Sequence, residues 1–292
     1  MKILVTGANG QLGNEIRLIK KKYTNTDFDF HDVDTLNLLD NKELELYFTK
    51  NNPDFVINCA AYTAVDNAEK DKENALKGNC KIVANLVSNS KKHHSKFIHI
   101  STDYVFDGNN CIPYKEDDPV NPESEYGRTK LLGEKEALKY KNSVIIRTSW
   151  LYSSFGNNFV KTMLRLGKER DNINVIFDQI GTPTYAADLA ESILEIINNS
   201  IKNNVFYPGI YHYSNEGVTS WYDFAWEIMN LSGINCHVFP IEAKDYPSPA
   251  KRPAYSLLNK NKIKTTYNLQ IPNWKDSLKR CLIQLGAINK TE

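Results

Sequence analysis

Tyr126 and Lys130 form the only pair in the chain in which a tyrosine is followed by a lysine four positions later, although the chain has 16 tyrosines. The stretch "SEYGRTKLLGE" around them (124–134) predicts a helix, on which positions i and i+4 share one face. A nearby ammonium favours phenolate and lowers the pKa of a phenol from its ordinary value of about 10. The spacing therefore fits a catalytic acid and its charge partner, and it also fits two unrelated residues on one helix face.

A strand predicted over "KFIHIST" (96–102) ends on two hydroxyl residues, Ser101 and Thr102. The carboxyl ends of neighbouring parallel strands open on one crevice, so a hydroxyl there can reach the pocket that a following helix lines. Thr102, Tyr126 and Lys130 are therefore expected to converge as a catalytic set.

A glycine-rich turn, "TGANGQLG", follows the first predicted strand and opens a helix. In a dinucleotide-binding turn, Gly7 would adopt a conformation closed to side chains, Gly10 would let the backbone approach a diphosphate, and Gly13 would let helix and strand pack closely. Gln11 and Leu12 begin the helix whose amino end attracts phosphate. An ordinary tight connection is the alternative, but the position after the first strand favours dinucleotide binding.

The second predicted strand, "FDFHDVD", ends at an acid about twenty residues after the turn, as a dinucleotide fingerprint requires. Asp32 could accept hydrogen bonds from the adenosine ribose, and Asp34 is the alternative; either could be a solvated turn residue. No arginine or lysine follows directly to hold a 2′-phosphate, which favours NADH slightly over NADPH.

The third predicted strand runs into small residues in "VINCAAYT". Ala60 and Ala61, followed by Tyr62, stand where the strand's carboxyl end would meet a cofactor, and a packed strand end is the alternative.

The elements that must position these residues alternate between strand and helix. Short apolar runs precede amphipathic stretches expected as helices over 13–22, 41–51, 73–93 and 126–140. This order predicts an α/β fold, a Rossmann-type doubly wound parallel sheet. Composition shifts after Trp150, so we expect an NAD(P)-binding domain over 1–150 and, over 151–292, mainly a smaller mixed α/β substrate-binding lobe, with later segments returning to the sheet. The Pro-rich stretch "YPSPAKRPAYS" (246–256) predicts a surface loop near a pocket.

Composition excludes several classes of function. Lys and Arg number 36 against 35 Asp and Glu, so no basic field would recruit nucleic acid. The five cysteines include no CxxC pair, and no apolar run approaches the ~18 residues of a membrane span. No metal-ligand motif such as HExxH occurs. We expect a reduced cytoplasmic protein that acts on small molecules, without membrane attachment or catalytic metal.

The glycine turn, the Thr102 strand end and the YxxxK pair together resemble the signature of the extended short-chain dehydrogenase/reductases. Further matching stretches cover almost the whole chain, among them "HISTDYVFDG", "RTSWLYSSFGNNFVKTML", "VIFDQIGTPT" and "RPAYSLLN". The resemblance implies NADH or NADPH as cofactor and reduction of the C4 keto group of a dTDP-linked 4-keto-6-deoxy sugar, in nucleotide-sugar synthesis for cell-surface polysaccharide. It also implies a homodimer.

The resemblance implies a role for each motif residue. Tyr126 would donate the proton, Lys130 would hold the nicotinamide ribose and depress the pKa of Tyr126, and Thr102 would hydrogen-bond the carbonyl oxygen. Asn157 is placed near the sugar nucleotide, and the residues expected to bind it are Thr102, Asp103, Trp150, Asn158 and Arg252. Those expected to bind the cofactor are Gly7, Gly10, Gln11, Leu12, Gly13, Asp32, Asn37, Leu38, Ala60, Ala61, Tyr62, Tyr126 and Lys130.

Two points depart from the family pattern or stay open. Asn37 in "LNLLD" stands where many members have Asp, so any adenine contact there lacks a carboxylate. Glu15 and Asp188 stand near acidic positions that bridge some bacterial dimers through magnesium, but they fit solvated helix charges equally well, so no metal is predicted. A sugar-nucleotide epimerase or dehydratase, or a non-catalytic regulatory subunit of the same fold, remains an alternative.

Overall fold

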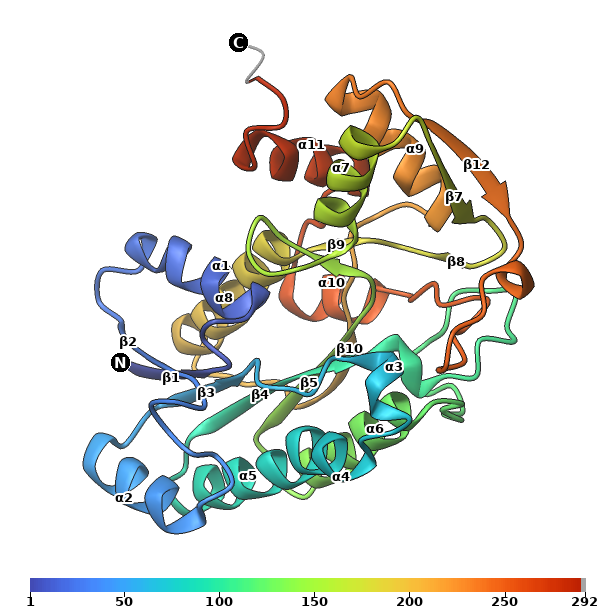
Figure 1. Ribbon diagram of the computed structural model, residues 1–292. Helices are drawn as coiled ribbons and strands as arrows, with labels where there is room; N and C mark the ends of the chain where they lie inside the picture. The colour runs from blue at the N-terminus through green and yellow to red at the C-terminus, as the bar shows by residue number, and fades with distance from the viewer. Residues whose placement is uncertain (290–292) are drawn as a thin grey trace.

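The computed structural model describes residues 1–289, and its centre is a six-stranded sheet in which every pairing is parallel (Figure 1). The strand order is β10-β5-β4-β3-β1-β2, so the order reverses between β1 and β3. The predicted Rossmann-type parallel sheet is confirmed. Its strands are β1 (Lys2–Thr6), β2 (Asp27–His31), β3 (Phe55–Asn58), β4 (Lys96–Thr102), β5 (Ser143–Thr148) and β10 (Gly209–His212).

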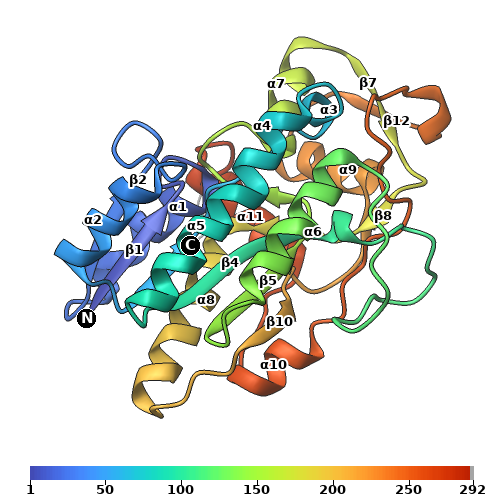
Figure 2. The same cartoon turned by 90° about the horizontal axis from the view of Figure 1, so that it is seen from below.

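Helices cover both faces of this sheet (Figures 1 and 2). One face carries α1 (Gln11–Ile19), α8 (Ala186–Lys202) and α10 (Asn261–Tyr267), and the other carries α2 (Asn41–Asn51), α4 (Lys72–Leu76), α5 (Ile82–Lys92) and α6 (Glu125–Ala137). Strands buried on both faces need apolar residues at successive positions. In β1, Ile3 and Val5 join the core under α8, whereas Leu4 joins the core under α5.

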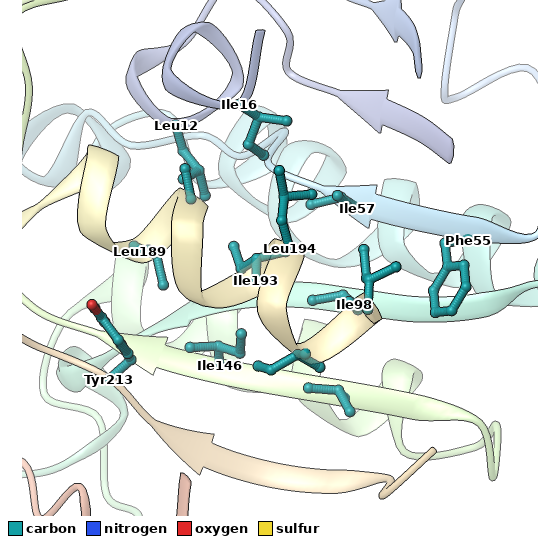
Figure 3. Packing of buried hydrophobic residues seen from close by; sticks show 14 of the residues in the cluster. Leu12, Ile16, Phe55, Ile57, Ile98, Ile146, Leu189, Ile193, Leu194 and Tyr213 are labelled. Atoms are coloured by element: carbon teal, nitrogen blue, oxygen red, sulfur yellow. The ribbon is translucent and has the colours of Figure 1, made fainter. Parts of the chain in front are cut away.

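Helix α8 shows how the later half of the chain completes the first domain. Leu189, Ile193 and Leu194 pack onto the strand residues Ile57 and Ile98 (Figure 3). Strand β10 pairs with β5 at the edge of the same sheet. Residues beyond 150 therefore return to the sheet.

A second core lies beside the sheet. It joins α7 (Phe159–Glu169), α9 (Trp221–Ser232) and α11 (Trp274–Gln284) to a two-stranded parallel sheet of β7 (Asn172–Ile176) and β12 (His237–Ile241). Two short strand pairs lie in the segments that connect it with the large sheet. These are β6 (Leu151–Tyr152) with β9 (Thr184–Tyr185), and β8 (Ile180–Gly181) with β11 (Thr219–Ser220). Other short helical segments are α3 (Val65–Ala68), η1 (Lys20–Lys22), η3 (Asp103–Val105) and η4 (Ala243–Asp245).

The helix expected over 73–93 is interrupted. A π-helical segment, η2 (Lys77–Lys81), separates α4 from α5. A Cβ on Gly78 would lie 3.0 Å from Cβ of Tyr62, and the Asn79 amide both accepts from the Tyr62 N–H (2.9 Å) and donates to its carbonyl (3.1 Å). The π-helical segment therefore packs against the loop after β3. Such segments are frequently found at functional sites.

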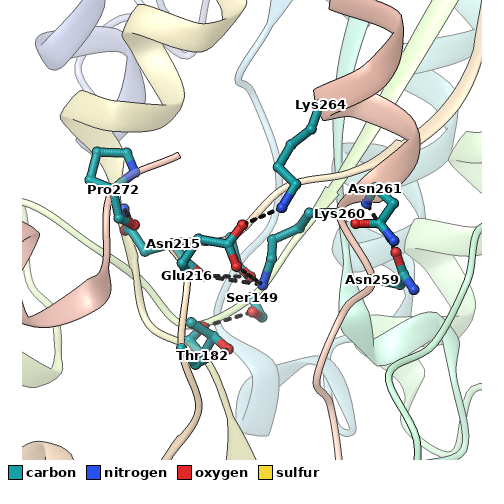
Figure 4. A network of polar contacts seen from close by, with 11 residues as sticks. Ser149, Thr182, Asn215, Glu216, Asn259, Lys260, Asn261, Lys264 and Pro272 are labelled. Atoms are coloured by element: carbon teal, nitrogen blue, oxygen red, sulfur yellow. Dashed lines mark hydrogen bonds and ion pairs between the residues drawn. The ribbon is translucent and has the colours of Figure 1, made fainter. Parts of the chain in front are cut away.

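A polar network ties the end of β10 to α10 (Figure 4). Glu216 lies 2.8 Å from the ammonium of Lys264 and 3.5 Å from that of Lys260. Nearby, Ser149 donates to the carbonyl of Thr182 at 2.8 Å. The Glu216 contacts hold α10 against the segment after β10, and the Ser149 bond joins the carboxyl end of β5 to the segment after β8. Within residues 1–289, no helix is long and apolar enough to cross a membrane.

Candidate active site

A cavity of about 900 Å³ opens at the carboxyl ends of β1, β3, β4 and β5. This is the edge of an open parallel sheet at which ligands bind, and it includes the point where the strand order reverses. The cavity brings together most of the residues expected from the sequence: Gly7, Gly10, Gln11, Leu12, Asp32, Asn37, Leu38, Ala60, Ala61, Tyr62, Thr102, Asp103, Tyr126, Lys130, Trp150 and Asn157.

The glycine turn packs closely against the loop after β3 and lines the cavity. Gly7 has φ +64°, and a Cβ there would lie 2.6 Å from the backbone nitrogen of Ala60. Gly10 begins α1 without a side-chain cap, and the first turn of that helix holds no acidic residue. The backbone N–H groups in the first turn of α1 thus keep their capacity to bind an anion. Gly13 lies behind the turn, where a Cβ would come within 2.6 Å of Cα of Ala8.

Asp32 follows β2 at the far end of the cavity. Its carboxylate accepts hydrogen bonds from the N–H groups of Asn9 (2.9 Å) and Val33 (2.8 Å), so it is fixed beside the glycine turn. Asn37 holds its own loop by accepting from the N–H of Leu39 at 3.1 Å. Among the lining residues in the described range, Lys130 is the only lysine or arginine.

Thr102, Tyr126 and Lys130 all line the cavity, and a hydrogen bond joins the Tyr126 and Thr102 side chains. Thr102 ends β4, and α6 carries the other two residues one turn apart. Ser124 caps this helix by accepting from the N–H of Gly127 at 3.1 Å, which fixes where its first turn begins. The ring of Tyr104 meets the Tyr126 ring edge-on, with centroids 5.4 Å apart. The predicted convergence is therefore present.

The expected lowering of the Tyr126 pKa by Lys130 is not what the structure gives. Burial raises the pKa of Tyr126 to about 12, a hydrogen bond with Thr102 lowers it in part, and the charge of Asp103 raises it further. The Lys130 ammonium instead donates to the carbonyl of Ile100 at 2.5 Å. Tyr126 thus holds its proton at neutral pH.

Lys130 is almost completely enclosed, with 2% of its surface exposed. Burial lowers its pKa to about 8, and the carboxylate of Glu134, one turn further along α6, acts in the opposite direction. Its charge is therefore sensitive to pH near neutrality.

Asp103 lies beside Thr102 and is also 2% exposed. Burial raises the pKa of its carboxyl to about 6, and the neighbouring Ser256 and Thr102 hydroxyl groups lower it in part. Its Oδ2 has no hydrogen-bond partner within residues 1–289. An unpaired buried oxygen at the cavity wall suits a hydroxyl group of a ligand.

Two residues expected at the sugar nucleotide stand outside the lining. The Asn158 amide caps α7 by accepting from the N–H of Lys161 (3.1 Å) and donates to Oε1 of Gln11 (3.0 Å), so it supports a lining residue. The Arg252 guanidinium forms a two-point ion pair with Asp66, with nitrogen–oxygen distances of 3.1 and 2.8 Å.

Glu15 and Asp188 are buried, so their interpretation as solvated helix charges is wrong. Glu15 accepts from Ser153 at 2.6 Å, and Asp188 accepts from Asn215 (2.7 Å) and Ser277 (2.5 Å). In the described part of the chain, no group of three or more His, Cys, Asp or Glu residues is arranged to hold a metal ion.

Sequence reasoning missed part of the lining. Val33, Leu36, Ser101, Tyr104 and Ser149 also face the cavity. Ser101 and Ser149 could have been found, because each lies at the carboxyl end of a strand already identified. Leu36 sits in an irregular loop that carries no pattern of its own.

Residues 1–286 match the family described as the RmlD substrate binding domain. The chain belongs to this family. Among relatives of the RmlD family, the spore coat polysaccharide biosynthesis protein SpsK of Bacillus subtilis is 39% identical over 282 residues, which is 96% of each chain. The reductase family expected from the sequence is confirmed.

Two solved structures carry the same fold as this RmlD family chain. The crystal structure of a dTDP-4-dehydrorhamnose reductase from Clostridium acetobutylicum is 43% identical, with a TM-score of 0.92 over 98% of this chain and 100% of that one. The dTDP-4-dehydrorhamnose reductase from Bacillus anthracis, solved in complex with NADP, is 37% identical, with a TM-score of 0.92 over 97% and 99% of the two chains.

Proposed function

We propose that this chain is an NAD(P)H-dependent reductase that converts the C4 keto group of dTDP-4-dehydro-L-rhamnose to a hydroxyl, giving dTDP-L-rhamnose. The observation that carries the proposal is the convergence of Thr102, Tyr126 and Lys130 on one cavity with an uncapped glycine turn. The chain also matches structures named dTDP-4-dehydrorhamnose reductase over nearly its full length.

The residues of the site can perform the proton half of this reaction. When bound, reduced nicotinamide supplies a hydride to the sugar carbonyl carbon. Tyr126 donates its proton to the carbonyl oxygen, and because a sugar alkoxide is a stronger base than phenolate, a phenol with a pKa of about 12 is still an adequate acid. Thr102 holds the same oxygen by a hydrogen bond. Lys130 holds the ribose hydroxyls of the cofactor.

The cavity fits a dinucleotide at its other end. Gly7, Gly10 and the first amides of α1 would hold the diphosphate, and Asp32 the adenosine ribose. The slight preference for NADH over NADPH stays a prediction, supported here by the carboxylate of Asp32 and by the scarcity of basic lining residues within the described range. The Bacillus anthracis relative was solved with NADP, so both cofactors need to be compared.

The sugar end of the cavity is formed where the two cores meet. We assign Asp103, Trp150 and Asn157, which all lie in the lining of the cavity, to this end. The same proposal assigns cofactor binding to residues 1–150 and sugar-nucleotide binding mainly to residues 151–292.

The test is consumption of NADH or NADPH by purified protein in the presence of dTDP-4-dehydro-L-rhamnose. Loss of reduced nicotinamide absorbance that needs both substrates, with dTDP-L-rhamnose as product, is the expected result. A flat trace with either cofactor would overturn the proposal. Cofactor that stays bound through purification without net consumption would favour an epimerase or dehydratase instead.

Substitution of Tyr126 by Phe tests the role of the phenol. We expect turnover to fall at least ~100-fold, the size of a general acid's contribution, with cofactor affinity nearly unchanged because only the hydroxyl is lost. Tyr140→Phe, just beyond the other end of α6, is the matched control and should leave turnover within about twofold. An equal loss of cofactor affinity in Tyr126→Phe would contradict the assignment.

A further inference from the structure

Trp150 has an unusual backbone. It follows β5 with φ +47°, in the left-handed region that bulky residues rarely adopt. Its carbonyl accepts from the N–H of Thr184 at 3.1 Å, and its side chain lines the cavity. Such a conformation persists only where the surroundings hold it, and it is often found at binding sites.

The second core holds the Trp150 indole in place. The ring of Trp221, the first residue of α9, stacks on it with centroids 3.6 Å apart and an interplanar angle of 11°. A Cβ on Gly181 would lie 2.8 Å from Cε2 of Trp150, so the indole rests against bare backbone there. Phe159 in turn supports Trp221, with centroids 4.6 Å apart.

Trp221 does not itself reach the ligand space. Within residues 1–289 the lining of the cavity includes Trp150 but not Trp221. Any effect of Trp221 on a ligand must therefore pass through the position of the Trp150 ring.

We propose that Trp221 is a positioning residue that fixes the Trp150 indole as a wall for the C–H face of the 6-deoxyhexose. The inference rests on the proposed function, because it assigns the Trp150 end of the cavity to the sugar. Stacked aromatic rings at this spacing attract each other beyond the effect of burial, and a rigid aromatic wall binds a sugar at little entropic cost. Trp221 thus sets affinity for the sugar nucleotide and leaves the cofactor end untouched.

The test compares Trp221→Met, which keeps apolar bulk without a ring, with Trp221→Phe, which keeps a ring. Isothermal titration calorimetry with dTDP-L-rhamnose and, separately, NADPH measures both affinities without turnover. Trp221→Met should weaken dTDP-L-rhamnose binding by about 3- to 10-fold, as the loss of one aromatic pair predicts, and Trp221→Phe by less than about threefold. NADPH affinity should not change in either variant.

Trp226→Met is the matched control, because Trp226 lies on the same helix with 50% of its surface exposed and should leave both affinities unchanged. Near-ultraviolet circular dichroism gives a second readout, since stacked indoles produce a coupled signal that should vanish in both Trp221 variants and persist in the control. If Trp221→Met does not fold, Gly181→Ala displaces the same indole and should weaken sugar-nucleotide binding in the same way.

Unchanged dTDP-L-rhamnose affinity in Trp221→Met, or an equal loss of NADPH affinity, would overturn the inference while the wild-type reductase activity stands. A wild-type protein that binds no dTDP-L-rhamnose would overturn both this inference and the proposed function. The two failures are therefore distinguishable in one set of measurements.

Discussion

Lys130 carries a charge that its surroundings disfavour. Its pKa of about 8 means that it is an ammonium below that pH and a neutral amine above it. Tyr126 and Cys59, each with a pKa raised to about 12 by burial, keep their protons in this range, and Asp103, with a pKa of about 6, has already lost its own. Between about pH 7 and 9, Lys130 is thus the group of this set whose charge changes.

We therefore predict that cofactor binding weakens as pH rises through about 8, by at most about tenfold per pH unit, and levels off once Lys130 is neutral, because the ribose loses its cationic partner. Titration of NADPH binding by calorimetry from neutral to alkaline pH measures this. Lys130→Met should bind weakly with no such step, whereas Lys135→Met, an exposed lysine on the same helix, should keep the wild-type dependence. The same step in Lys130→Met would show that another group titrates.

Helix α6 is fastened to the sheet one turn beyond Lys130, which we propose as a catalytic residue together with Tyr126. Glu134 accepts from Ser101 of β4 at 2.5 Å and from two nitrogens of Arg147 of β5 at 2.9 and 2.8 Å. Both members of this ion pair are buried. A buried pair brings little net stability, but the loss of one partner leaves a costly unpaired charge. The pair therefore fixes where α6 lies relative to the end of β4, and so where Tyr126 lies relative to Thr102.

We predict that Arg147→Met lowers the free energy of unfolding by about 3–5 kcal/mol, because the Glu134 carboxylate is left buried and unpaired. The double variant Glu134→Leu with Arg147→Met should lose less than the single one. Urea denaturation measures both. The exposed pair Arg165 and Glu169 is the control, and Arg165→Met should cost less than about 1 kcal/mol. Costs that add in the double variant would contradict this account of α6.

The whole molecule brings the Pro-rich loop 246–256 into direct contact with α3, through hydrogen bonds from Ala250 and Arg252 to Asp66. Arg252 of this loop pairs with Asp66, which lies 186 positions earlier in the chain, and its charge also reaches the lining residue Tyr104. Arg252 was expected to bind the sugar nucleotide, and its planar guanidinium, here paired with Asp66, would suit the diphosphate of that ligand equally well. Asp66 would then compete with the ligand for Arg252.

We predict that Arg252→Ala raises the KM for the dTDP sugar at least about tenfold, the cost of a charged hydrogen-bond partner, whereas Asp66→Ala leaves it equal or lower. Steady-state kinetics at saturating cofactor measures this. Lys251→Ala, a neighbouring residue paired with Glu123 on the surface, is the control and should have no effect. Equal increases in KM for Arg252→Ala and Asp66→Ala would mean that the ion pair only holds the loop.

The homodimer stays a prediction. Light scattering tests it by comparing the mass of the particle in solution with the chain mass of 33.4 kDa.

The sequence by itself determined the parallel sheet and the centre of the site. Strand and helix periods are local, so the residues over 96–102 and 41–51 could be assigned without neighbours, and the structure has the same bounds. The convergence of Thr102, Tyr126 and Lys130 on one cavity could also be predicted, because one helical turn joins Tyr126 to Lys130 and a strand end presents Thr102. The glycine turn was accessible because its chemistry lies within seven residues.

Only the tertiary structure decided which residues from distant segments contact one another. Asp66 pairs with Arg252, Trp150 stacks on Trp221, and the Asn79 side chain accepts a hydrogen bond from the N–H of Tyr62. Nothing in the local sequence pattern marks these pairs. The direction of the Tyr126 pKa shift was mistaken for the same reason, since spacing along one helix says nothing of burial. Periodicity reports which face of an element is buried, whereas partners and electric fields are set by the folding of the whole chain.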